Sequence, residues 1–262
     1  MFLSGKKNTR TLIVVMAITV ILGIIVARYY YRSLNHSIDP RIAGARELYT
    51  SYNRHALEGD YKAIFRLLDS IESIYLATEH YRNSFEVGVL HNNRAAAILT
   101  IALHRESIPP AADPFSDAGF DSLVSMAEIQ LLKAVEIYRH WQGIYRGHTD
   151  EEIKSRIAAG FIKELKDYPA KTAERYMERR VREIMDATLE NDRRLSVCYS
   201  NLGLVCRHRG EIREAADHYQ KALKLWDRNL EAENNLNILL GRPMKKRNLL
   251  QKLFPPERES AP

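Results

Sequence analysis

Few residues in this chain have the types and spacing that catalysis requires. Glu136 and His140 are four residues apart, so on a helix they could share a ligand, but one such pair among 9 histidines is expected by chance. The acids from Asp150 to Glu152 suit the first turn of a helix, where the helix dipole favours negative charge. The sequence contains no phosphate-binding glycine loop, HExxH motif, nucleophile elbow or CxxC pair. We therefore predict no enzyme, no cofactor, no metal site and no small-molecule substrate.

Three aromatic residues are better candidates for binding than for catalysis. Tyr138, Trp141 and Tyr145 fall on one face of a predicted helix, beside several cationic residues. They could form a hot spot for a protein partner. The alternative is that this aromatic stripe belongs to the core, which is the commoner use of such spacing.

The basic charge of the chain lies at its two ends. The formal net charge is +6, of which residues 1–10 carry about +3 and residues 242–262 about +4. The residues between them are therefore close to neutral, whereas a nucleic-acid-binding domain carries a basic face of its own. We predict no nucleic-acid partner.

Cys198 and Cys206 are about 12 Å apart if they share a helix, too far for a disulfide.

Residues 11–32 are predicted to anchor the chain in a membrane, behind the basic tail 1–10. The run 11–27 has 17 uncharged residues, about 25 Å of helix, and Tyr29 to Tyr31 follow between two arginines. A cleavable signal peptide is the alternative, although Ile25-Val26-Ala27 is a poor cleavage site. A short basic tail that stays inside favours an inner (cytoplasmic) membrane protein with a periplasmic domain, but cations on both sides nearly balance.

The remaining chain is predicted to be an all-α domain over residues 37–241, followed by the basic tail 242–262. Asp39 and Pro40 begin a first helix, Gly59 ends it, and Asp60 caps the next. A third helix covers about 83–104, a long Pro- and Asp-rich loop follows from Ser107, and Asp121 caps a long helix. Thr149 to Glu152 form a capping box. A charged helix covers about 171–190, and three further helical segments follow.

Two of these helices have a regular pattern of small and large residues. From position 196 onward, the spaced residues are Tyr199, Leu202, Gly203, Cys206, Gly210, Ala215, Tyr219 and Ala222. This pattern resembles the tetratricopeptide repeat, with Cys206 replacing a usual aromatic residue and Asp227 a usual proline. The small residues allow two helices to cross closely, and Tyr219 fills the space beside them. We predict an α-solenoid whose clearest repeat is 196–229, with a capping helix at 230–240.

A second copy becomes visible if the loop after Ser107 is treated as an insertion that widens one repeat. Ala127, Leu131 and Ala134 reproduce the spacing of Ala215, Tyr219 and Ala222, and Asn93 resembles Asn201. The helices around Gly59 are a third, degenerate candidate.

The resemblance implies a surface that binds extended peptides or partner helices. In the family, an asparagine on the first helix often holds the backbone of the ligand, which implies this role for Asn93, Asn201 and Asn235. The alternative is that these asparagines bond to neighbouring helices. Ser200 and Glu231 stand where the family's clamp for chaperone tails has basic residues, which argues against a co-chaperone. We predict a membrane-anchored adaptor or scaffold in a cell-envelope complex, with a periplasmic chaperone-like protein as the alternative.

Overall fold

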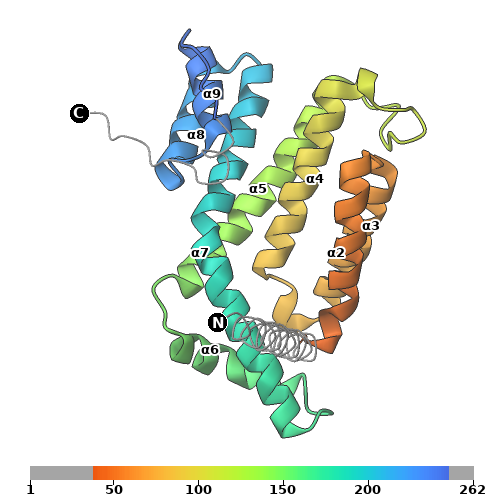
Figure 1. The fold of residues 1–262 in the computed structure, drawn as a ribbon, viewed down its shortest axis with the longest axis vertical. Helices are drawn as coiled ribbons and strands as arrows, with labels where there is room; N and C mark the ends of the chain where they lie inside the picture. The colour runs from red at the N-terminus through yellow and green to blue at the C-terminus, as the bar shows by residue number, and fades with distance from the viewer. Residues whose placement is uncertain (1–37, 248–262) are drawn as a thin grey trace, which may run out of the picture.

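The computed structural model describes residues 38–247, and all regular structure within that range is helical (Figure 1). This confirms the predicted all-α class. The α-helices are α2 (Pro40–Glu58), α3 (Tyr61–Ala77), α4 (Phe85–His104), α5 (Phe120–Tyr145), α6 (Asp150–Lys163), α7 (Ala170–His208), α8 (Ile212–Leu225) and α9 (Leu230–Leu239). Two short 3₁₀ turns, η1 (Glu79–Tyr81) and η2 (Arg105–Ser107), follow α3 and α4.

Neighbouring helices pair into three hairpins, α2–α3, α4–α5 and α7–α8, and α9 packs on the last of them. Figure 1 shows these hairpins side by side, with α6 at the opposite end of α7 from α8 and α9. Successive hairpins meet through the packing of α3 on α4 and of α5 on α7. Stacked hairpins of this kind are consistent with the predicted solenoid.

Several helix boundaries follow directly from the sequence. The Asp39 side chain caps α2, and Gly59 ends that helix at a φ of 70°, a conformation open to glycine at little cost. Asp60 accepts the Ala63 amide at 3.1 Å, and Thr149 opens α6 with a capping box. One prediction was wrong: Gly119, not Asp121, occupies the cap position of α5.

The predicted break near Glu190 does not exist. The charged helix and the first helix of the repeat are one helix, α7, of 39 residues, or about 58 Å at 1.5 Å per residue. The sequence between 186 and 196 contains no proline or glycine, and Gln142 of α5 donates to Asp192 at 2.7 Å in the middle of this stretch. The repeat at 196–229 therefore begins about two thirds of the way along α7, and the earlier part of that helix projects beyond the repeat.

The long connection between α4 and α5 folds back onto α3. Arg105 pairs with the buried Asp113 at 3.0 Å and donates to the carbonyls of Ala118 and Phe115 at 2.7 Å. The Phe115 ring lies edge-on to that of Phe65 on α3, with the ring centroids 4.9 Å apart. The predicted loop is present, and its contacts link the first hairpin to the second.

Two predicted segments lie outside the described residues: the anchor at 11–32 with its basic tail, and most of the tail 242–262 beyond residue 247. Within residues 38–247, no helix combines the length and the hydropathy that crossing a membrane requires.

Candidate partner-binding groove

The first helices of the three hairpins, α2, α4 and α7, line one open groove of about 470 Å³. Tyr75 of α3 also contributes to it. In helical solenoids, the first helices commonly form the surface that binds a partner. The lining residues are Arg46, Tyr49, Tyr75, Phe85, Glu86, Val89, Leu90, Arg179 and Glu183.

The groove has an apolar floor and a charged rim. Tyr75, Phe85 and Leu90 are buried members of the core at its base. At the rim, Glu183 of α7 accepts hydrogen bonds from Arg46 of α2 and, at 2.8 Å, from Arg179 one turn away. Apolar side chains beside satisfied charges are typical of surfaces that bind protein, because the floor supplies burial and the rim fixes orientation.

A buried arginine holds the α7 side of the groove. The Arg180 side chain is 1% exposed and pairs with Glu86 of α4 at 2.5 Å. Its guanidinium group also lies 4.4 Å from the centre of the Tyr81 ring and 5.7 Å from that of Trp141. Burial raises the pKa of Glu86, but the Arg180 charge and the hydrogen bonds that the carboxylate accepts together lower it by more, so its pKa lies below the ordinary value. This contact fixes α7 against the start of α4.

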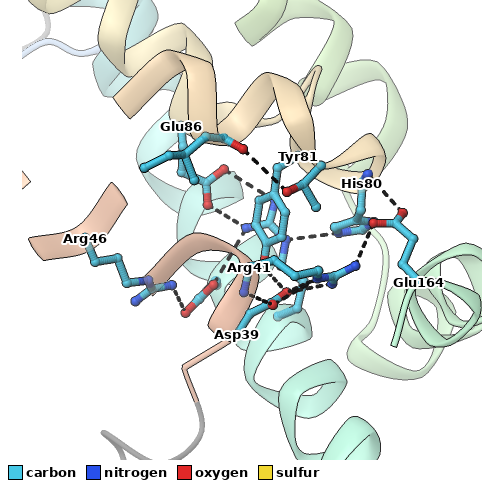
Figure 2. A network of polar contacts seen from close by, with 11 residues as sticks. Asp39, Arg41, Arg46, His80, Tyr81, Glu86 and Glu164 are labelled. Atoms are coloured by element: carbon cyan, nitrogen blue, oxygen red, sulfur yellow. Dashed lines mark hydrogen bonds and ion pairs between the residues drawn. The ribbon is translucent and has the colours of Figure 1, made fainter. Parts of the chain in front are cut away.

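A second arginine extends this network to the start of the described chain (Figure 2). Arg41 pairs with Asp39 and with Glu164 of the α6–α7 connection, both at 2.6 Å. The Tyr81 hydroxyl donates to Asp39 at 3.2 Å, and the His80 amide donates to Glu164 at 3.1 Å. Three separate segments, the start of α2, η1 and the α6–α7 connection, therefore meet at one polar cluster, which stabilises their arrangement.

His80 remains neutral inside this cluster. Burial, followed by the charges of Arg180 and Arg41, lowers the pKa of His80 to about 3. Arg180 donates from Nε to His80 Nε2 at 3.2 Å, which requires that ring nitrogen to be an acceptor. Protonation would therefore remove an acceptor and place a third cation beside two others.

The three predicted asparagines occupy different environments. Asn93 on α4 donates to the Tyr49 hydroxyl of α2 at 2.7 Å, and Tyr49 lines the groove. Asn235 on α9 accepts from Arg207 of α7 at 3.0 Å, so it joins two helices, as the alternative interpretation expected. Asn201 is half-buried, and its amide makes no hydrogen bond within the described part of the chain. Asn201 is therefore the one whose polar atoms remain open to a ligand.

The aromatic trio lies in the core. Tyr138, Trp141 and Tyr145 are all buried, and Phe85 packs against the first two with ring centroids 5.0 and 6.0 Å away. The hot-spot interpretation was therefore wrong for the surface of this domain, and the core interpretation holds. Helical spacing alone cannot distinguish the two, because a core stripe and an exposed stripe have the same period.

Sequence reasoning missed most of the groove. One signal was available for Arg180, because it falls at helical spacing with Ala173, Met177 and Ile184, which are all buried. A cation at a core position of an amphipathic helix indicates a buried ion pair. No comparable signal marks Arg46 or Glu183, which meet only because the fold brings this part of α2 to α7.

Comparison with known families supports one part of this description. The tetratricopeptide repeat family matches residues 196–229, so a repeat of this kind lies in the second half of α7 and in α8. Such repeats generally mediate protein–protein interactions. Searches of curated proteins and of solved structures gave no match.

The packing inside the matched repeat explains its two most characteristic positions. A Cβ placed on Gly203 would lie 2.6 Å from the Tyr219 ring, so any larger residue there would force the ring to shift. The α4–α5 hairpin has the same contact, because a Cβ on Gly88 would lie 2.8 Å from the Tyr138 ring. If Gly88 is aligned with Gly203, the residue equivalent to Asn201 is Glu86 rather than Asn93. Glu86 and Asn93 are two helical turns apart and therefore lie on the same face of α4.

Proposed function

We propose that this chain is a membrane-anchored adaptor that binds a protein partner in the groove between α2, α4 and α7. The observation that carries the proposal is the groove itself, which the first helices of three stacked hairpins line together. The tetratricopeptide repeat at residues 196–229 supports a role of the domain in protein–protein interaction. The buried Arg180 network makes the groove rigid, which lowers the entropic cost of binding.

The proposal places the adaptor in the inner membrane, with its domain in the periplasm and its partner in a cell-envelope complex. Residues 11–32 support the anchor by their length, hydropathy and flanking aromatic residues. Extraction of membranes with alkaline carbonate should leave the full-length chain in the pellet and release a chain that lacks residues 1–37. Protease added to spheroplasts should digest the domain, and protection of the domain would reverse the proposed orientation.

The partner is tested by a pull-down of the full-length protein in mild detergent, read by mass spectrometry. Val89 is half-buried in the groove, and Val89→Arg should release a single dominant partner. Leu132→Arg is the matched control, because Leu132 is an exposed residue of α5, a second helix outside the groove lining. Loss in the first variant and retention in the second support the adaptor. Retention in both would show that the partner binds elsewhere, and a diffuse set of clients would favour a chaperone.

The asparagines provide a separate test, because neither Asn201 nor Asn235 is among the residues that line the groove. Asn201→Ala removes an amide that has no hydrogen bond within residues 38–247, so it should weaken partner binding without changing stability. Asn235→Ala breaks the contact with Arg207 and should lower stability more than binding. If the two variants behave alike in both measurements, Asn201 has no special role in recognition.

A further inference from the structure

The chain turns back on itself after α9. Gly241 has a φ of 65°, and the Arg242 amide then donates to the Asn237 carbonyl at 2.8 Å. Lys245 bonds through its amide and its carbonyl to the Asn234 side chain, at 2.7 and 3.0 Å. This direction carries residues 242–247 along α9 toward the start of that helix.

The last described residue therefore lies beside the connection between α8 and α9. Arg247 donates to the Arg228 carbonyl in that connection at 2.8 Å. Asn229, the next residue of the connection, donates to the Ser196 hydroxyl of α7 at 2.9 Å. The chain thus leaves the described region beside the connection that contacts α7 at Ser196.

Beyond Asp192, which pairs with Gln142 of α5, the same face of α7 carries two exposed apolar residues. Leu189 and Met185 precede Ser196 by about two and three helical turns, which places all three on one face. The α8–α9 connection covers this face at Ser196. Leu189 is 84% exposed and Met185 is 37% exposed. Trp226 stands at the boundary, half-buried, with the Arg193 guanidinium group 5.0 Å from the centre of its ring. We call Met185 and Leu189 the α7 stripe.

The residues that follow Arg247 have the composition that such a stripe requires. Within the seven positions that follow Arg247 there are four large apolar residues: Leu249, Leu250, Leu253 and Phe254. An extended chain covers about 3.3–3.6 Å per residue, so three residues cover about 10 Å, which equals two turns of α7. The apolar part of the tail can therefore reach the stripe from the place where the described chain ends.

We propose that residues 249–254 dock on the α7 stripe and shield Leu189 and Met185 from solvent. Three features converge on this occupant: the return of residues 242–247 along α9, the position of Arg247 beside the α8–α9 connection that contacts α7 at Ser196, and the apolar residues immediately after Arg247. The docked segment adds a covering layer on α7 next to the point where its packing against the α8–α9 connection ends. This contact lies outside the groove and does not depend on the adaptor function.

Disulfide trapping in the full-length protein tests the contact. Leu189→Cys combined with Leu250→Cys should form an intramolecular disulfide under mild oxidation. Leu57→Cys combined with Leu250→Cys is the control, because Leu57 is 91% exposed but lies on α2, in another hairpin. The first pair should react at least about tenfold faster, since docking raises the effective concentration of the two thiols. The native Cys198 and Cys206 are buried, so they should interfere little.

Equal rates for the two pairs would overturn the proposal. Disulfides that link two chains would also overturn it and would assign the stripe to a second copy of the protein. A second measurement avoids any dependence on disulfide geometry. The thiol in Leu189→Cys should react several-fold faster with a maleimide when Leu253→Asp and Phe254→Asp are added, whereas the thiol in Leu57→Cys should keep its rate. An unchanged rate at position 189 would show that the tail does not cover it.

Discussion

The α4–α5 and α7–α8 hairpins use the same close contact but differ in how their helices are connected. In both, a glycine on the first helix lies against a tyrosine ring on the second, Gly88 against Tyr138 and Gly203 against Tyr219. Residues 209–211 connect the helices of the α7–α8 hairpin, whereas residues 105–119 connect those of the α4–α5 hairpin. The shared contact shows that a small residue opposite a large one can set helix register without a tight turn.

The α4–α5 hairpin, which we call the widened hairpin, has a contact that compensates for its long connection. At its open end, Arg180 of α7 pairs with Glu86 of α4 and lies over Trp141 of α5. A single guanidinium group thus holds both helices at the end where no loop joins them. In the α7–α8 hairpin, the turn at Gly210, with a φ of 80°, keeps the helices together directly.

The largest expected effect on stability comes from removing the Arg180 side chain. Arg180→Leu leaves the Glu86 carboxylate without its main partner, and the Glu86 side chain is only 26% exposed. We expect a loss of about 2–3 kcal/mol in the free energy of unfolding, somewhat below the usual cost of a fully buried orphan charge. Urea unfolding followed by tryptophan fluorescence measures it. The control Arg182→Leu, at an exposed position of the same helix, should cost less than about 0.5 kcal/mol. Equal losses in the two variants would show that Arg180 does not hold α4 and α5 together.

Substitution of the two glycines compares the hairpins directly. Gly203→Ala forces a Cβ to 2.6 Å from the Tyr219 ring, and Gly88→Ala forces one to 2.8 Å from Tyr138. Overpacking costs about 1–3 kcal/mol, partly offset by about 1 kcal/mol of helix propensity, so we expect net losses of about 1–2 kcal/mol at Gly203 and less at Gly88. Gly160→Ala, which meets no atom within 4 Å, should be neutral or stabilising in the same denaturation assay. A stabilising Gly203→Ala would contradict the close contact.

Acid should weaken the widened hairpin through His80. The pKa of His80 is about 3 in the folded protein and about 6.5 when unfolded, so between these values the unfolded chain binds the extra proton. Stability is then unaffected above pH 6.5 and falls as the pH drops, by about 1–2 kcal/mol at pH 5. Thermal melts of the protein and of His80→Gln between pH 7 and pH 5 should diverge, with the variant less sensitive. Parallel curves would show that His80 is not buried as a neutral group.

The smallest effect concerns the long connection itself. Asp113 is buried and pairs with Arg105, so Asp113→Ala should cost about 1 kcal/mol in the free energy of unfolding. Asp117→Ala, at an exposed position of the same loop, should be nearly neutral. If both variants are neutral, the loop does not contribute to joining the first two hairpins.

Sequence reasoning predicted local features of this fold much better than distant contacts. Capping by Asp39, Asp60 and Thr149 was predictable because each cap depends on residues within one turn. Gly203 and Tyr219 were predictable because the repeat places them at fixed spacing. The continuity of α7 was not, because Asn191 and Asp192 have modest helix propensity and the hydrogen-bond donor to Asp192, Gln142, lies on a different helix, α5.

The candidate site was less predictable for the same reason. Arg46, Glu86 and Glu183 come from three helices that are distant in sequence, and no periodic pattern links them. Tyr138 and Trp141 illustrate the opposite error, because their spacing is regular but does not reveal which side of the helix is buried. Only the arrangement of the hairpins determines which predicted residues share a surface.

Site-specific photo-crosslinking tests the central claim, that the first helices form one partner-binding groove, most directly. A photoreactive phenylalanine analogue replaces Val89 of α4 in one full-length protein and Leu132 of α5 in another, and both are irradiated in cells. The groove predicts one dominant crosslinked protein from position 89 and little or none from position 132. Crosslinks from position 132 alone, or equal crosslinks from both positions, would contradict it.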